Sequence, residues 1–121
     1  MKESIIKIKS FAFSVRIVRL YQFLKNNRKE FVMPKQLLRC GTSMGALIRE
    51  TEQAESRQDF KHKLSISQKE INEAIYWLEL LKATDFLEAR QFDSINNDAV
   101  EIIKILTSII RSIKLNAGVN N

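Results

Sequence analysis

Apolar residues recur at helical spacing in the first quarter of the chain. Phe13, Ile17, Leu20 and Leu24 follow one another at steps of four, three and four, which is the spacing of one face of an α-helix. This stripe predicts a helix over about residues 3 to 29. Further apolar residues lie beside it, namely Phe11, Val15, Val18, Tyr21 and Phe23. The apolar surface is wider than a helix of a monomeric bundle needs, and it indicates a second buried contact, such as one with another subunit.

A second helix is predicted to begin near Pro34, because proline suits the first turn, where its missing N–H costs nothing. One face then carries apolar or small residues at helical spacing: Leu37, Gly41, Met44 and Ile48. Gly41 and Gly45 form a small-x-x-x-small pair, with Ser43 and Ala46 nearby. Glycine inside a helix costs roughly 1 kcal/mol relative to alanine, so we expect a neighbouring helix to approach closely in compensation. Taken alone, this glycine-containing stretch would also fit a loop.

Two longer stripes follow. Ser56 and Asp59 have the spacing of a capping box, which predicts a third helix from about residue 57. Its stripe is Phe60, Leu64, Ser67, Ile71, Ala74, Leu78 and Leu81. A fourth helix, over about residues 88 to 115, carries Phe92, Ile95, Ala99, Ile102, Leu106, Ile109 and Ile113. We predict an all-α, antiparallel up-down-up-down four-helix bundle, with residues 1 to 121 as one domain, Gly118 as a helix stop and residues 116 to 121 as a disordered tail.

Composition agrees with this class of fold. The chain has 121 residues, of which only three are glycine and one is proline, too few turn formers for an all-β sandwich. The single cysteine, Cys40, excludes an intramolecular disulfide and indicates a reducing compartment, with the thiol as a small core residue. Lysines interrupt the opening apolar residues, and no apolar run reaches spanning length. We expect a cytoplasmic protein without a membrane partner.

Charge is distributed unevenly along the chain. Residues 1 to 39 carry ten basic and two acidic side chains, a net charge of +8, whereas residues 40 to 121 carry a net charge of −2. Clustered cations displace counterions from phosphates, so the first third is a candidate surface for RNA or DNA. The candidate residues are Lys7, Lys9, Arg16, Arg19, Lys25, Arg28 and Lys29. The same excess also fits a solvated face that keeps a small protein soluble.

No constellation of residues indicates catalysis. The only histidine, His62, lies between two lysines, which oppose a metal cation, and its spacing from Asp59 makes a weak pair of ligands. Glu70 and Glu73 give Glu-x-x-Glu once, whereas a ferritin-like di-iron bundle repeats Glu-x-x-His. A phosphate-binding glycine loop is absent from the sequence. We expect no enzymatic activity, no metal and no cofactor.

Other charged and aromatic residues are interpreted as structural. Arg39, Glu50 and Glu73 are expected to form ion pairs between the second and third helices, because a paired charge fixes helix register. Tyr76 and Trp77 could stack on bases. Buried aromatic side chains usually serve packing, which favours a core or subunit-contact role for this pair.

A longer pattern joins these residues. It comprises Arg39, Gly41, Ser43, Ala46, Ile48 and Glu50, then Ser56, Arg57, Asp59, Phe60, Lys63 and Leu64, then Glu70, Glu73, Tyr76, Trp77 and Leu78. The pattern resembles the bacterial "four helix bundle protein" family, first noticed as reading frames inside intervening sequences of large-subunit ribosomal RNA genes. The likeness covers about residues 8 to 114, and Leu47 stands where the family commonly has Asn. We take Arg39, Gly41, Ser43, Gly45, Glu50 and Glu73 as its structural motif.

The resemblance carries expectations about assembly and partners. The family is similar to the accessory variability protein of diversity-generating retroelements, a ring-shaped pentamer of four-helix subunits thought to engage nucleic acid and a reverse transcriptase. The resemblance implies a homo-oligomer, such as a pentamer, with a basic surface. Our leading hypothesis is a non-enzymatic oligomer that binds RNA or DNA through phosphate contacts, which position a protein without reading sequence. The alternative is a protein-interaction scaffold or accessory subunit that makes no direct contact with nucleic acid.

Overall fold

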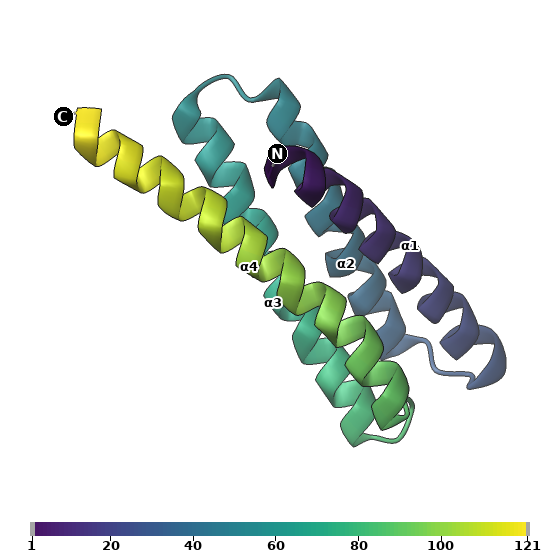
Figure 1. The fold of residues 1–121 in the computed structure, drawn as a ribbon. Coiled ribbons are helices and arrows are strands. Elements are labelled where there is room, and N and C mark those ends of the chain that lie inside the picture. Colours follow the sequence, from purple (N-terminus) through teal and green to yellow (C-terminus); the bar gives the residue numbers. More distant parts are fainter. Residues whose placement is uncertain (1, 121) are drawn as a thin grey trace.

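Helices make up almost all of the structure. The computed structural model describes residues 2–120, and the side chains of residues 4–116. The elements are α1 (Lys2–Asn27), α2 (Val32–Glu50), the short 3-10 helix η1 (Thr51–Gln53), α3 (Arg57–Ala83) and α4 (Ala89–Asn120). No strand occurs within residues 2–120. The four long helices alternate in direction (Figure 1), which confirms the predicted all-α four-helix bundle.

Each helix packs against two neighbours. α1 contacts α2 and α4, and α3 contacts the same two helices, so the order around the bundle is α1, α2, α3, α4. One cluster of buried apolar side chains fills the centre. The stripes predicted for α3 and α4 contribute many of these side chains, and Leu64, Ile71, Leu78, Ile102 and Leu106 are almost fully buried. Helix-period apolar spacing therefore identified the core faces correctly.

Local signals explain the helix boundaries. Ser56 Oγ accepts a hydrogen bond from the Asp59 amide at 3.0 Å, and Asp59 Oδ2 accepts one from the Glu55 amide at 3.1 Å. This reciprocal cap begins α3 at Arg57, as predicted. The cap of α2 was not foreseen: Glu30 Oε2 accepts the first two amides of that helix, at 3.2 and 3.1 Å. Lys29, in a left-handed conformation with φ of 57°, reverses the chain between α1 and α2.

The two glycines of α2 lie against α1. A Cβ at Gly41 would come within 2.9 Å of Ile17 Cγ1 and Cγ2, and one at Gly45 within 2.8 Å of Ser14 Oγ. Ser14 Oγ also donates a hydrogen bond of 2.9 Å to the Gly41 carbonyl. The stretch is helical, not a loop, and the expected close approach of a neighbouring helix is present. The contact compensates for the low helix propensity of glycine.

The end of α4 differs from the prediction. α4 continues past Gly118 to Asn120, so the expected helix stop at Gly118 is wrong. One glycine costs a helix only about 1 kcal/mol, which does not end it without a further break. The side chains of residues 117 to 120 and all of residue 121 lie outside the described part, so the expected disorder of residues 116 to 121 stays a prediction. No helix among residues 2–120 is both long and apolar enough to cross a membrane.

Candidate functional site

Two of the candidate basic residues near the start of α1 form ion pairs with other elements. Lys7 Nζ lies 2.8 Å from Glu52 Oε1 of η1. Lys9 pairs with Glu101 of α4. The hydrogen bond from Lys7 also holds the pKa of the Glu52 carboxyl below its usual value. These two lysines lie on opposite flanks of α1, and nearby carboxylates offset their charges.

Arg16 is also engaged within the molecule. Its Nη1 donates to Asp98 Oδ2 at 2.7 Å and to the Ser94 carbonyl at 3.2 Å, and its Nη2 donates to Ser94 Oγ at 3.0 Å. This fork fixes α1 against the first half of α4. Internal ion pairs therefore neutralise three of the seven candidates, Lys7, Lys9 and Arg16. The side chain of each is about two-fifths exposed.

The other four candidates form what we call the α1 end cluster: Arg19, Lys25, Arg28 and Lys29. None of them has an ion-pair partner among the described side chains. Arg28 is held by neutral groups, since it donates to the Asp85 carbonyl at 3.1 Å and to the Phe86 carbonyl at 3.4 Å. Its guanidinium carbon lies 4.9 Å from the Phe86 ring centroid. The charge of Arg28 is thus oriented without being neutralised.

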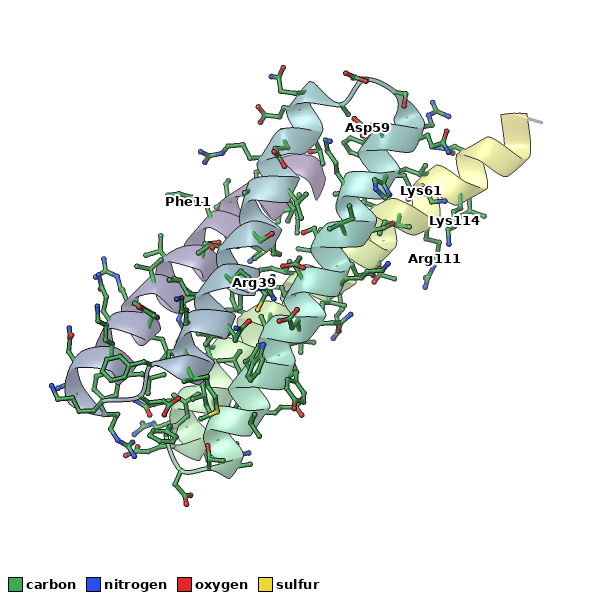
Figure 2. All side chains as sticks on the ribbon, turned by 180° about the vertical axis from the view of Figure 1, so that it is seen from behind. Phe11, Arg39, Asp59, Lys61, Arg111 and Lys114 are labelled. Carbon is green, nitrogen blue, oxygen red and sulfur yellow. The ribbon has the colours of Figure 1, made fainter. Side chains whose placement is uncertain are left out.

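One side of α1 exposes apolar residues to solvent. We call it the α1 outer face: Ile5, Ile8, Phe11, Val15, Val18 and Phe23. Ile8 is 70% and Phe11 59% exposed, whereas the core residues Phe13 and Ile17 of the same helix are at most 1% exposed. Figure 2 shows Phe11 at the edge of the bundle. Within the described part of the chain, the surplus apolar surface predicted for this helix therefore lies on a side of α1 that stays largely exposed.

A groove beside the α1 outer face runs between α1, α2 and η1. Its volume is about 730 Å³, and it is lined by small residues such as Gly45 and Ala46 together with Phe11 and Arg49. The Arg49 guanidinium carbon lies 5.6 Å from the centroid of the Phe11 ring. Glu50 also lines this groove. Small side chains and one large aromatic residue, flanked by charged groups, are suited to contact with another protein surface.

The structural motif centres on Arg39. Its Nη1 lies 3.2 Å from Glu70 Oε2 and its Nη2 2.5 Å from Glu73 Oε2, which ties α2 to α3. Trp77 Nε1 donates to the same Glu73 oxygen at 3.0 Å. The expectation that Glu50 joins this network is wrong, because Glu50 lies at the far end of α2 and has no ion pair among the described residues. Gly41 and Gly45 face α1, and Ser43 is half-buried on α2.

Hydrogen bonds from Trp77 and Arg39 lower the pKa of Glu73 below its ordinary value of 4.5. A carboxyl with a lowered folded-state pKa stabilises the protein above its unfolded pKa, and this contribution is lost as the pH falls through the folded-state value. We expect Glu73→Gln to reduce the free energy of unfolding at pH 7, by no more than about 1 kcal/mol because the pair is half-exposed. Urea titrations should show the difference shrinking below pH 4.5. A difference that persists unchanged in acid would assign the effect to packing of Trp77.

The remaining reactive side chains do not form a site. Cys40 is fully buried, and burial raises the pKa of its thiol to about 12, so it is a protonated core residue. His62 is exposed, and no group of three or more metal-ligating side chains occurs in the described part of the chain. Trp77 packs against the core, whereas Tyr76 is 57% exposed and meets Trp77 edge-on at 5.2 Å between ring centroids.

Comparison with known proteins gives a consistent assignment. The model of a family described as 23S rRNA-intervening sequence protein matches residues 2–108. A solved structure, described as a protein with unknown function from the S23 ribosomal protein family from Bacteroides thetaiotaomicron, has a TM-score of 0.91 and 59% sequence identity. That match covers 92% of this chain and 99% of the other. No curated protein matches.

Proposed function

The chain belongs to the 23S rRNA-intervening sequence protein family, and from this premise we propose that it is a non-enzymatic, self-associating four-helix bundle that binds RNA or DNA through basic surfaces. The observation that carries the proposal is the α1 end cluster. Its four cations have no carboxylate partner among the described side chains, and they extend from α1 into the α1–α2 turn. Cations whose charge is not offset internally are free to replace counterions on a phosphate backbone.

Self-association would strengthen such a surface. One α1 end cluster offers a handful of phosphate contacts, each of them weak. A closed ring of subunits, with the α1 outer face buried between copies, would repeat the cluster around its axis and convert weak contacts into avid binding. The family is described by its place in 23S rRNA intervening sequences and the solved relative by the S23 ribosomal protein family, and this association with ribosomal RNA supports a nucleic-acid partner. The pentameric ring stays part of the proposal.

Neutralising the α1 end cluster should weaken binding to all nucleic-acid sequences alike. In the variant Arg19→Gln, Lys25→Gln, Arg28→Gln and Lys29→Gln, we expect the slope of log affinity against log salt to fall by up to about four units, since each lost phosphate contact contributes close to one. Fluorescence anisotropy with labelled RNA and with DNA duplex measures this slope.

The matched control is Lys7→Gln with Lys9→Gln, since the charges of these lysines are already offset by Glu52 and Glu101. We expect a smaller loss of affinity in the control for each charge removed. Circular dichroism should remain helical for both variants. Equal losses per charge would show that binding follows net charge alone and that the cluster has no special role.

The alternative function, a protein-interaction scaffold, has its own support in the α1–α2 groove. The groove is lined by Phe11 and small residues together with charged side chains such as Arg49 and Glu52, a mixture of apolar and polar groups that also occurs in protein interfaces. A parent protein that binds neither RNA nor DNA at low salt, yet self-associates, would favour this scaffold and overturn the nucleic-acid proposal.

A further inference from the structure

A polar stripe runs along the second half of α4. Lys104, Thr107, Arg111 and Lys114 follow one another at steps of three, four and three, so they share one face of the helix. The three cations are exposed. Residues 102 to 121 contain no aspartate or glutamate. Glu101, one turn before Lys104, pairs with Lys9 of α1, and no acidic side chain follows it in the sequence to offset Arg111 and Lys114.

α3 adds to the same surface. Gln68 Nε2 donates a hydrogen bond of 2.8 Å to Thr107 Oγ1, which fixes the polar stripe of α4 against α3. Lys61 lies two turns before Gln68 on α3, on the same side of the helix. Figure 2 shows Lys61 on the stretch of α3 next to the α4 segment that bears Arg111 and Lys114. A shallow cavity of about 250 Å³ lies between these helices, lined in part by Gln68, Thr107, Arg111 and Lys114.

The acidic residues nearest to this surface are engaged elsewhere. Asp59 accepts the Glu55 amide and lies 3.4 Å from Lys63 Nζ. Glu70 faces α2, where it pairs with Arg39. Residues 60 to 69 contain no acidic side chain at all. The result is a local excess of positive charge on both sides of the α3–α4 boundary.

We propose that the α3–α4 basic strip, defined as Lys61, Lys104, Arg111 and Lys114, is a second binding surface for the sugar–phosphate backbone of a nucleic acid. This inference rests on the proposed function and adds a surface distinct from the α1 end cluster. Arg28 of that cluster contacts the α3–α4 turn at Asp85 and Phe86, whereas the strip lies toward the opposite end of the bundle (Figure 1). One strand of nucleic acid could then follow the long axis of the bundle between the two.

The spacing of the strip suits a phosphate chain. Lys104 and Arg111 are seven residues apart, which at 1.5 Å per residue is about 10.5 Å. That distance is about three steps of one strand of duplex DNA, at roughly 3.4 Å per step. Lys114 lies about one turn beyond Arg111. Cations at this spacing can thus meet phosphates of one strand that lie about three steps apart along the duplex axis.

The surroundings favour nucleic acid over a membrane or a protein. A membrane-binding helix combines cations with apolar residues that insert between lipids, whereas Gln68 and Thr107 fill the centre of this strip. A protein interface is anchored by a cluster of aromatic or aliphatic side chains, whereas the apolar residues at this strip are Ile110, which is already buried in the bundle core, and the exposed Leu115 beside Lys114. Uniform positive charge with polar hydroxyl and amide groups matches the chemistry of a phosphate backbone.

The test uses the triple variant Lys61→Gln, Arg111→Gln and Lys114→Gln in the full chain. We expect at least about tenfold weaker binding to labelled RNA or DNA at low salt, with the salt slope reduced by about three units. The charge-preserving variant Lys61→Arg, Arg111→Lys and Lys114→Arg should bind as the parent does. Helical circular dichroism and unchanged mass in solution confirm that each variant is folded and assembled.

The outcomes separate this inference from the proposed function. A parent that binds neither RNA nor DNA overturns both. A parent that binds while the triple Gln variant binds equally well overturns the strip alone, and loss of binding only in the α1 end cluster variant then confines the interface to that cluster. Parent binding to anionic phosphatidylserine vesicles that exceeds binding to RNA, and that the triple Gln variant loses, would make the strip a membrane surface and overturn the assignment to nucleic acid.

Discussion

Gly41→Leu is expected to destabilise the bundle strongly, because α1 leaves no room for a side chain at this position of α2. Even a Cβ would lie 2.9 Å from two carbons of Ile17, and Ile17 is fully buried in the core. A leucine adds three further carbons to the same contact. Overpacking costs about 1 to 3 kcal/mol, sometimes more, whereas the gain in helix propensity over glycine is about 1 kcal/mol. We therefore expect a net loss of up to about 2 kcal/mol in the free energy of unfolding, at the upper end of this range because Ile17 is fully buried and has little room to move; urea unfolding measures it.

Two companion variants test the steric cause. Lys35→Leu places the same side chain at an exposed position of the same helix and should leave the free energy of unfolding within about 0.5 kcal/mol of the parent. Gly41→Ala combined with Ile17→Ala should be less harmful than the sum of the two single changes, because the second removes Ile17 Cγ1 and Cγ2, the two carbons that the new Cβ would approach to 2.9 Å. An unchanged or higher melting temperature for Gly41→Leu would show that α1 and α2 separate readily at this contact.

The fold could be predicted from the sequence because each helix carries one apolar stripe, and the four stripes face one common core. Leu64, Ile71 and Leu78 repeat at the period of a helix, and nothing in the chain competes with that signal. The start of α3 was readable for a similar reason, since Ser56 and Asp59 act locally. The cap supplied by Glu30 to α2 was missed, because a glutamate before a helix start is not by itself a recognised capping pattern.

The candidate site was less readable because ion pairing is a long-range property. Lys9 and Glu101 are far apart in sequence and meet only when α1 packs on α4. Counting charge in the first third of the chain could not separate Arg16, which Asp98 neutralises, from Arg28, which carbonyl groups orient. The exposed α1 outer face, in contrast, could be predicted from the sequence, because the apolar stripe of α1 is wider than one core contact needs.

The net charge of a long segment also concealed the α3–α4 basic strip. Residues 40 to 121 have a net charge of −2, but all twelve of their acidic residues lie before residue 102. The last turns of α4 are therefore basic although the segment as a whole is not. Charge read in windows of one or two helical turns, and then placed on helix faces, would have found the stripe that contains Arg111 and Lys114.

The second large effect is expected on assembly. If the parent forms the proposed oligomer, we expect the double variant Ile8→Glu and Phe11→Glu to be monomeric. Burying a large apolar side chain stabilises an interface by about 1.5 to 3 kcal/mol, and these two are the most exposed apolar residues of the α1 outer face, at 70% and 59%. Losing both should weaken each subunit contact by roughly 3 kcal/mol, or about a hundredfold in the dissociation constant. Analytical ultracentrifugation across a concentration series measures it.

The control for this variant is Leu115→Glu, which introduces the same charge at a side chain that is 64% exposed but lies on α4, away from the α1 outer face. It should assemble as the parent does. Both variants should keep the helical spectrum, since none of the three side chains contributes to the buried cluster. If the salt dependence of nucleic-acid binding is weaker for the double variant than for the parent, the reason would be that a monomer presents fewer basic surfaces than an oligomer. A parent that is monomeric, or a double variant that keeps the parent's mass, would show that the α1 outer face does not join subunits.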